Sequence, residues 1–302
     1  MNPLFRCHIC GGTEHRVVFS APHDFEYGVE YAAKVVCCSS CGVHSIYPLP
    51  AATDLPRFYP NQYANYGKSA SRLTELLVSM YERSYRREIA RLTPAGGHVL
   101  DVGCSCGHYL DIISKGTSLQ VSGTELSDEA AAPARAKGYT VHVGEFENIK
   151  LPQNHYDVIR MSHLIEHVIN PETTLRAAYN ALKPGGHLLL ETPNTGALDC
   201  RIFGRYWGAL HYPRHLHLFN VGQLARLITA TGFSPPLATG TMMSTGWAMG
   251  IQNYLVSRHN IVLKNGRAAF YPLLLLLFVP VLFLQNLTGN ATMVKYVAAK
   301  PA

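Results

Sequence analysis

The chain of 302 residues is long enough for one large domain with a small additional module, or for two modest domains. Its 47% apolar content is that of a globular protein with a sizeable core. The net charge of +6 is spread along the chain, which argues against a dedicated nucleic-acid-binding protein but not against acidic or membrane partners. No basic stretch followed by an apolar run stands at the N-terminus, so we expect no signal peptide, a cytoplasmic location and reduced cysteines.

Two C-x-x-C pairs, each followed directly by glycine, stand near the N-terminus. They are Cys7 with Cys10 and Cys38 with Cys41. Two residues between the cysteines let a tight turn aim both sulfurs at one ion, and the glycine lets backbone amides turn toward the thiolates. This pattern predicts a zinc ribbon with a structural four-cysteine zinc site, which leaves no open position for catalysis. Cys37 is an alternative ligand to Cys38, and a redox-active pair of motifs is the other interpretation.

A connector rich in proline and tyrosine follows the second cysteine pair. After it, residues 71–92 carry a helical apolar pattern, for which Ser71 is a suitable N-cap. We therefore place the zinc-ribbon module and its connector in residues 1–66 and the second domain in residues 67–302.

The second domain begins with short apolar runs separated by stretches of helical length. The expected strands are HVLDVG, LQVSGTEL, TVHVGE, YDVIRMS and GHLLLETPN, followed by strands near residues 236–243 and 293–301. This alternation predicts an α/β fold with a doubly wound parallel sheet. Ligands of such sheets bind at the carboxyl ends of the strands. We expect the chemistry just after the ends of four strands, at Val102, Gly123, Val143 and Met161.

The first of these strands leads into a glycine turn. Gly103 and Gly107 allow the backbone to approach a ligand closely, and the following helix presents its N-terminus to that ligand. Glu125 ends the next strand, about 20 residues further on, where a carboxylate can accept hydrogen bonds from two ribose hydroxyls. The two features together predict a cofactor that contains a nucleoside.

VLDVGCSCGHYL and VSGTELS resemble the first two motifs of class I S-adenosylmethionine-dependent methyltransferases. VGEFENIKLPQNHYDVIRMSHLIEHVINP resembles the third and fourth motifs, in which Glu145 would meet the adenine amine and Phe146 would flank the ring. The resemblance implies a Rossmann-like seven-stranded sheet and S-adenosylmethionine as cofactor. Ser105 stands where the family usually has glycine. The cofactor residues that it implies are Asp101, Gly103, Ser105, Gly107, Glu125, Leu126, Glu145, Phe146, Ser162 and His163.

The N-terminal part adds a second resemblance. Its CxxCG, CxxCG, P-x-P, FYP and YxxY motifs resemble the zinc-binding module of sugar methyltransferases, which are common in bacterial polysaccharide and natural-product pathways. This implies a small-molecule or glycan acceptor. Some related quinone methyltransferases carry acidic and histidine metal ligands near the fourth strand, so a metal there stays open.

Histidines follow the fourth and fifth strands, where an acceptor would lie. Methyl transfer to a hydroxyl or a carbon acid requires an aligned acceptor and removal of a proton, for which histidine is suited. His163 and His167 follow the fourth strand, and His215 and His217 follow the fifth. The resemblance supports His167 and His215 as pocket residues, and Glu166 would orient a partner. Which histidine is the base stays open.

Other interpretations fit parts of these motifs. Residues 103–107 match the G-x-S-x-G turn of α/β-hydrolases, and residues 163–167 match the H-x-x-E-H arrangement of inverted zinc proteases. A dinucleotide oxidoreductase would need a G-x-G-x-x-G order that is absent. Two alternatives keep the fold: an RNA methyltransferase that grips nucleic acid with its zinc ribbon, and a non-catalytic cofactor-binding module. Arg214 would bind a substrate phosphate or carboxylate, or form a surface ion pair.

An apolar segment at residues 270–288 precedes the last strand, and we place it in an insertion over residues 268–290. Its uninterrupted run, 273–284, is about half as long as a membrane-spanning helix and contains Pro280. It is either a kinked helix of the core or a surface that lies on a bilayer or covers a lipidic substrate. Because such an insertion adjoins the acceptor side, we expect a lipid-linked acceptor and peripheral membrane contact through residues 270–288.

Overall fold

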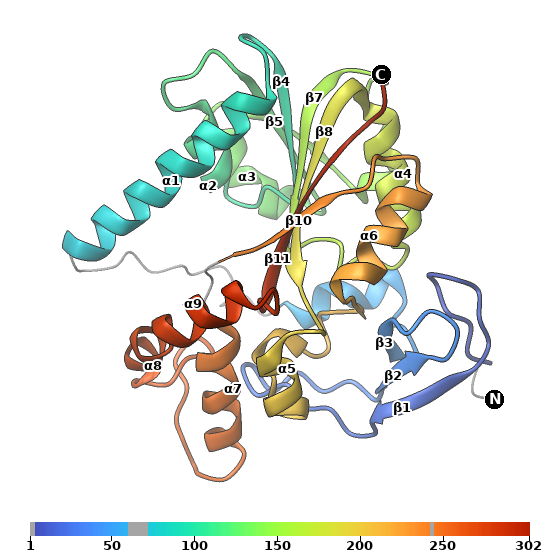
Figure 1. The fold of residues 1–302 in the computed structure, drawn as a ribbon, viewed down its shortest axis with the longest axis vertical. Coiled ribbons are helices and arrows are strands. Elements are labelled where there is room, and N and C mark those ends of the chain that lie inside the picture. Colours follow the sequence, from blue (N-terminus) through green and yellow to red (C-terminus); the bar gives the residue numbers. More distant parts are fainter. Residues whose placement is uncertain (1–3, 60–71, 242–244) are drawn as a thin grey trace.

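The computed structural model describes residues 4–59, 72–241 and 245–302, which form two β-sheets with helices around them. The larger sheet occupies the upper part of Figure 1, and the N-terminal module lies below it. The predicted boundary between residues 66 and 67 falls outside the described residues.

The smaller sheet belongs mainly to the N-terminal module. It contains the antiparallel strands β1 (His15–Phe19), β2 (Lys34–Cys38) and β3 (His44–Tyr47). Its fourth strand, β9 (His217–Leu218), comes from a much later part of the chain and pairs with β3. The 3-10 helix η1 (Ala52–Phe58) follows the sheet. The N-terminal module is therefore built into the rest of the protein through β9.

The larger sheet has the strand order β10-β11-β8-β7-β4-β5-β6. Its strands are β4 (His98–Val102), β5 (Gln120–Glu125), β6 (Thr140–Val143), β7 (Tyr156–Ser162), β8 (Leu182–Pro193), β10 (Leu237–Gly240) and β11 (Met293–Ala299). The strands from β4 to β8 are parallel, and β11 runs antiparallel to both β8 and β10. The predicted seven-stranded Rossmann-like sheet is confirmed, and the carboxyl ends of its parallel strands meet at one edge.

Helices cover the sheet because their apolar faces need a partner. They are α1 (Arg72–Leu92), α2 (His108–Ser114), α3 (Asp128–Ala136), α4 (Pro171–Ala181) and α6 (Val221–Ala230). Asn220 caps α6 in a reciprocal capping box with Gln223. The predicted N-cap of α1, Ser71, lies outside the described residues.

A helical insertion separates β10 from β11 and consists of α7 (Thr245–Val256), α8 (Tyr271–Leu277) and α9 (Val279–Leu287). It thus begins well before residue 268, the predicted start. These helices gather beside α5 (Leu198–Phe203) on the same side of the large sheet as the N-terminal module (Figure 1). Within the described residues, no helix combines the length and the apolar character that crossing a bilayer requires.

Candidate active site

The loop after β4 meets the end of β5 at the carboxyl edge of the sheet. Gly103, Ser105 and Gly107 have φ angles of +76°, +47° and +78°, so the loop folds back tightly on itself. The backbone N–H of Ser105 donates to Glu125 Oε2, and the N–H of Leu126 donates to Oε1, both at 2.8 Å. A carboxylate accepts about four hydrogen bonds, so these two donors leave capacity for two hydroxyl groups. The glycine turn and the carboxylate therefore fit a ribose-containing cofactor.

Ser105 adopts a left-handed backbone conformation that favours glycine. We expect Ser105→Gly to raise the free energy of unfolding by about 0.5 kcal/mol, because relief of this conformation exceeds the entropy that glycine adds to the unfolded chain. Urea denaturation measures the difference. Gly107→Ala is the reciprocal control and should destabilise, because its Cβ would lie 2.9 Å from Ala134 Cβ. A less stable Ser105→Gly protein would contradict the prediction.

Asp101, the first residue of the predicted cofactor motif, forms a buried ion pair. Its Oδ1 accepts from Arg160 Nη1 at 2.6 Å, and the two side chains are only 2% and 6% exposed. The guanidinium also lies 3.6 Å from the ring centroid of Tyr109. Burial raises the pKa of Asp101, and Arg160 opposes that shift. The pair joins the neighbouring strands β4 and β7 directly beneath the glycine loop.

The residues expected around the adenine lie at the adjacent ends of β5 and β6. The N–H of Gly144 donates to the carbonyl of Glu125 at 2.9 Å, which joins the two strand ends. Leu126 is half exposed there and offers an apolar surface. Glu145 is exposed and accepts from the Asn148 side chain at 2.7 Å, and Phe146 is buried in the main core beside it.

The segment 163–167 forms a turn and not the helix of an inverted zinc protease. His163 Nδ1 lies 3.4 Å from Glu166 Oε1, and the fully buried Glu166 accepts from Thr192 Oγ1 at 2.8 Å through Oε2. Burial alone would lower the pKa of His163, but its contact with Glu166 raises that pKa above the ordinary value. The side chain of His163 is 35% exposed, so this histidine reaches the surface of the site.

His167 and His215 lie behind His163 and are turned toward each other, with ring centroids 4.6 Å apart. His167 Nδ1 lies 3.0 Å from the Arg214 carbonyl, and His215 Nδ1 lies 2.8 Å from the Ala209 carbonyl. These carbonyls favour the tautomer that carries its proton on Nδ1 and leave Nε2 with a lone pair. Burial lowers the pKa of both rings, to about 3 for His215. Burial therefore favours the neutral form of both rings.

Glu166, His167 and His215 form a candidate metal centre, because each offers one ligand atom and these atoms lie within 4.8 Å of one another. Glu166 Oε1 is buried and accepts no hydrogen bond from the described residues, although His163 Nδ1 lies 3.4 Å away. Two imidazoles with backbone-fixed tautomers and one carboxylate are ligands suited to a divalent transition metal. These three residues could hold such an ion. The alternative is that they only shape the pocket.

Arg214 is buried and therefore neither binds a substrate nor forms a surface ion pair. Its Nη1 and Nη2 donate to the two carboxylate oxygens of Asp24 at 2.9 and 2.8 Å. Through Asp24 the N-terminal module thus holds the loop that carries His215. Tyr59 Oη adds a contact of 2.9 Å to His167 Nδ1. No motif in the sequence marks Asp24 or Tyr59 as a site residue. Arg160 is the one charged residue inside the apolar end of YDVIRMS, and this is the only sequence signal for its role.

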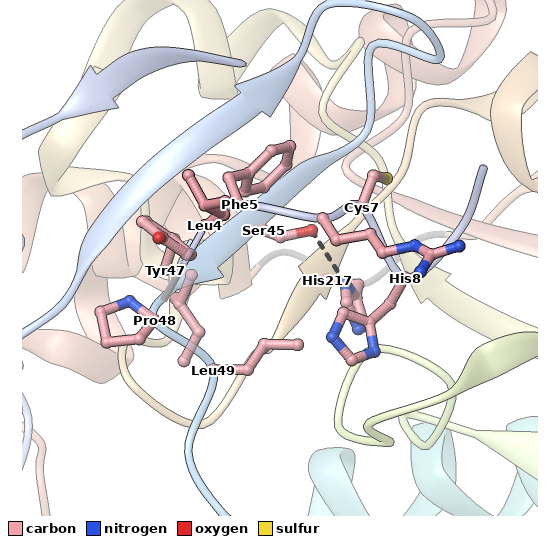
Figure 2. A pocket seen from close by; sticks show the side chains of 11 residues that line it. Leu4, Phe5, Cys7, His8, Ser45, Tyr47, Pro48, Leu49 and His217 are labelled. Atoms are coloured by element: carbon pink, nitrogen blue, oxygen red, sulfur yellow. Dashed lines mark hydrogen bonds between the residues drawn. The ribbon is translucent and has the colours of Figure 1, made fainter. Parts of the chain in front are cut away.

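His217 belongs to the N-terminal sheet and not to the histidine cluster. Its Nδ1 lies 2.8 Å from Ser45 Oγ and its Nε2 lies 3.1 Å from the Ile169 carbonyl. Figure 2 shows it at a cavity of about 210 Å³ together with Phe5, His8 and other residues of the N-terminal module. Among the described residues, Cys7 and His217 are the only predicted site residues that line this cavity, and neither was assigned to the cofactor, so it is separate from the candidate cofactor site.

The four predicted zinc ligands converge. The sulfurs of Cys7 and Cys41 are 3.7 Å apart, those of Cys10 and Cys38 are 3.6 Å apart, and all four lie within 4.8 Å of one another. Sulfurs around a tetrahedral zinc at about 2.3 Å are separated by about 3.8 Å, so the spacing fits zinc. The thiol of Cys37 is directed to backbone carbonyls, which leaves Cys38 as the ligand of that pair.

Comparison with known proteins agrees with this geometry. Residues 78–235 match the family of methyltransferase domains. The chain is 33% identical over 140 residues to a ubiquinone biosynthesis O-methyltransferase of Xanthomonas axonopodis pv. citri (strain 306), which covers 43% of this chain and 58% of that protein. A probable S-adenosylmethionine-dependent methyltransferase of Mycolicibacterium smegmatis is 28% identical over 157 residues, or 51% of this chain and 58% of that protein. The chain spans about half the length of the curated relatives that it matches.

Solved structures share the fold at low sequence identity. An S-adenosylmethionine-dependent methyltransferase from Archaeoglobus fulgidus has a TM-score of 0.51 at 17% identity and covers 74% of this chain and 94% of that one. Phosphoethanolamine N-methyltransferase 2 of Haemonchus contortus, in complex with S-adenosylmethionine, has a TM-score of 0.50 at 17% identity and covers 86% and 62%. These likenesses concern the fold alone.

Proposed function

The chain belongs to the class I S-adenosylmethionine-dependent methyltransferase family, and from this premise we propose that it methylates an oxygen or carbon of a small-molecule, sugar or lipid-linked glycan acceptor. The observation that carries the proposal is the contact of the glycine loop with Glu125, together with the partly exposed His163 directly after β7. The O-methyltransferase activity named for the Xanthomonas relative supports oxygen as the acceptor atom.

The proposed cofactor site runs along the carboxyl ends of β4 to β7. S-adenosylmethionine supplies, when bound, a methyl group activated by a positively charged sulfur. Glu125 would accept hydrogen bonds from the ribose hydroxyls, and Leu126 would cover one face of the adenine. The backbone of residues 103–107 would line the methionine end, with Ser162 and His163 beside it. Glu145 and Phe146 complete the proposed adenine site, while Asp101 supports the loop through Arg160.

We propose His163 as the general base. Its Nδ1 faces the Glu166 carboxylate, so Nε2 is the nitrogen that can accept a proton from the acceptor hydroxyl. Glu166 would orient the imidazole and stabilise its protonated form, as a third group does for other catalytic bases. His215 is buried and His167 is half-buried, both close to Glu166, and they would shape the pocket or hold a divalent cation.

Replacing His163 by alanine should lower kcat roughly 100- to 10,000-fold, because the acceptor would lose its proton acceptor. Affinity for S-adenosylhomocysteine should fall far less. The assay follows transfer of labelled methyl from S-adenosylmethionine to a panel of free sugars, catechols and lipid-linked sugars. His155→Ala is the matched control, because His155 precedes β7 and His163 follows it. A folded His163→Ala enzyme with parental kcat would exclude this residue as the base.

The N-terminal module has a structural role in this proposal. Zinc held by the four cysteines would fold the module, and Asp24 would then keep Arg214 and its loop against the histidine cluster. Two alternatives predict other outcomes. RNA binding in a gel-shift assay would favour an RNA methyltransferase, and cofactor binding without turnover on any acceptor would favour a non-catalytic module.

The helical insertion supports a lipid-linked acceptor. Residues 270–288 expose large apolar side chains on the side of the large sheet that carries the candidate site. Peripheral membrane contact through this segment is part of the proposed function.

A further inference from the structure

α8 and α9 together present an unusually apolar surface. Six of their side chains are 56–72% exposed: Leu273, Leu276, Leu277, Phe283, Leu284 and Leu287. No charged residue stands between Arg267 and Lys295. Soluble monomers rarely expose apolar patches larger than a few hundred Å² unless the patch binds a partner. A surface of this composition is therefore expected to have an occupant.

Buried polar contacts fix the direction in which this surface faces. On the inner side of α9, Gln285 Oε1 accepts from Trp247 Nε1 at 2.6 Å, and Gln285 Nε2 donates to Asp199 at 2.9 Å. The Trp247 ring also stacks on Phe278, between α8 and α9, with centroids 5.3 Å apart. Because these contacts hold the inner side, rotation of the helices to bury the leucines would break them. The leucines therefore face outward as a property of the fold.

The surroundings of this surface are basic. No Asp or Glu follows Asp199 in the sequence. Exposed basic residues stand on the neighbouring elements, at Arg201, Arg205, Arg258 and Lys264. Two of them are close together, because Arg205 lies over Tyr206 and Arg258 over Tyr254, and these tyrosine rings are 5.5 Å apart.

This charge pattern decides which occupant fits. A second copy of the chain would bring two sets of exposed arginine and lysine side chains against each other, and like charges would oppose that contact. An anionic lipid surface attracts basic residues and accepts inserted leucine and phenylalanine side chains. The pattern therefore favours a bilayer over a dimer.

A short path of hydrogen bonds joins this surface to the candidate base. Asn286 on α9 donates to the Thr241 carbonyl at 3.4 Å, and Thr241 Oγ1 donates to Glu191 Oε1 at 2.9 Å. The carbonyl of Glu191 accepts from the N–H of His163 at 2.8 Å. α9 is thus linked to the strand end that His163 follows.

We propose that α8 and α9 dock on an anionic bilayer, with the leucines inserted and the arginines at the headgroups, and that the acceptor reaches His163 from the membrane. The part that concerns the acceptor rests on the proposed methyl transfer. The docking itself does not, because it depends only on the surface.

The test measures co-sedimentation of the full chain with vesicles of phosphatidylglycerol and phosphatidylcholine, and with vesicles of phosphatidylcholine alone, without cofactor or acceptor. The parent should bind the anionic vesicles, and more weakly at high salt. The double substitution Leu276→Asp with Leu284→Asp should weaken binding at least about 100-fold, because two inserted apolar side chains are lost. Leu4→Asp, an exposed leucine in the N-terminal module, is the control and should bind like the parent.

Charge is tested separately. Arg258→Glu should weaken binding to anionic vesicles several-fold, at roughly the value of one basic residue near a charged membrane. Arg226→Glu on α6 should leave binding unchanged.

Three results would overturn the docking proposal. They are no binding of the parent to anionic vesicles, equal binding of the double aspartate variant, and a parent dimer that the same variant dissociates, which would assign the surface to a second copy. Titration with S-adenosylhomocysteine shows whether each variant is folded. If the parent binds anionic vesicles but does not bind S-adenosylhomocysteine, the proposed methyltransferase function is rejected. The docking proposal is then still supported.

Discussion

Glu125→Ala should weaken the binding of S-adenosylhomocysteine by about 100-fold or more. The expected loss is two hydrogen bonds from ribose hydroxyls to a charged carboxylate, each contributing about 1.5–3 kcal/mol. The substitution also removes the acceptor for the Ser105 and Leu126 N–H groups, so the glycine loop loses its anchor to β5. Both effects act on the cofactor and neither requires an acceptor to be known.

Calorimetric titration of the zinc-loaded protein measures this effect directly. Glu129→Ala is the matched control, because Glu129 is an exposed glutamate four residues further along and makes the same change in charge. Glu125→Gln should fall between the parent and the alanine variant, since an amide oxygen still accepts a hydrogen bond but carries no charge. If the folded parent and Glu125→Ala proteins bind S-adenosylhomocysteine with equal affinity, Glu125 does not contact the ribose. The main support for the proposed cofactor site is then lost.

Cys38→Ala should abolish the binding of one equivalent of zinc and unfold the N-terminal module. Structural zinc contributes roughly 10–16 kcal/mol in small zinc-dependent domains, so the remaining three thiolates should not preserve the module. The loss should extend beyond it, because β9 pairs with β3 and Asp24 holds Arg214. We therefore expect a lower unfolding temperature and reduced cofactor affinity along with the lost metal.

Cys37→Ala is the matched control for this substitution, since Cys37 is the adjacent residue and its thiol lies outside the sulfur cluster. It should retain the zinc of the parent. Metal analysis after dialysis, together with thermal unfolding, compares the two variants. Full zinc in Cys38→Ala, or loss of zinc in Cys37→Ala, would mean that the second knuckle uses a different ligand.

The architecture of the large sheet and much of the candidate site could be read from short segments of sequence. A strand, a glycine turn and a carboxylate about 20 residues later are linked by one strand–helix–strand unit, and such a unit has few ways to fold. The contact between Ser105 and Glu125 follows from that local geometry. The capping box of α6 is equally local, because Asn220 and Gln223 lie within one turn.

The composition of the apolar segment at residues 270–288 does not determine which of its side chains are buried. A run of leucines meets the requirements of a buried helix and of a lipid-facing one, since both remove apolar side chains from water. The structure resolves the run into two short helices that bury Tyr271, Leu282 and Gln285 and expose most of the leucines. Which side is buried depends on Trp247 and Asp199, which stand far earlier in the chain.

By itself the sequence determined the α/β class, the order of the strands along the chain, the glycine turn with Glu125 and the four-cysteine pattern. Each of these depends on spacing within a short segment, which backbone geometry converts into one arrangement. Only the tertiary structure decided that Asp101 is neutralised by Arg160, that Asp24 holds Arg214 and that His163 is partly exposed while His215 is buried. The partners in the Asp101–Arg160 and Asp24–Arg214 ion pairs are 59 and 190 residues apart. Burial of such charges is tolerated only where packing brings the two partners together, and no local sequence pattern encodes that packing.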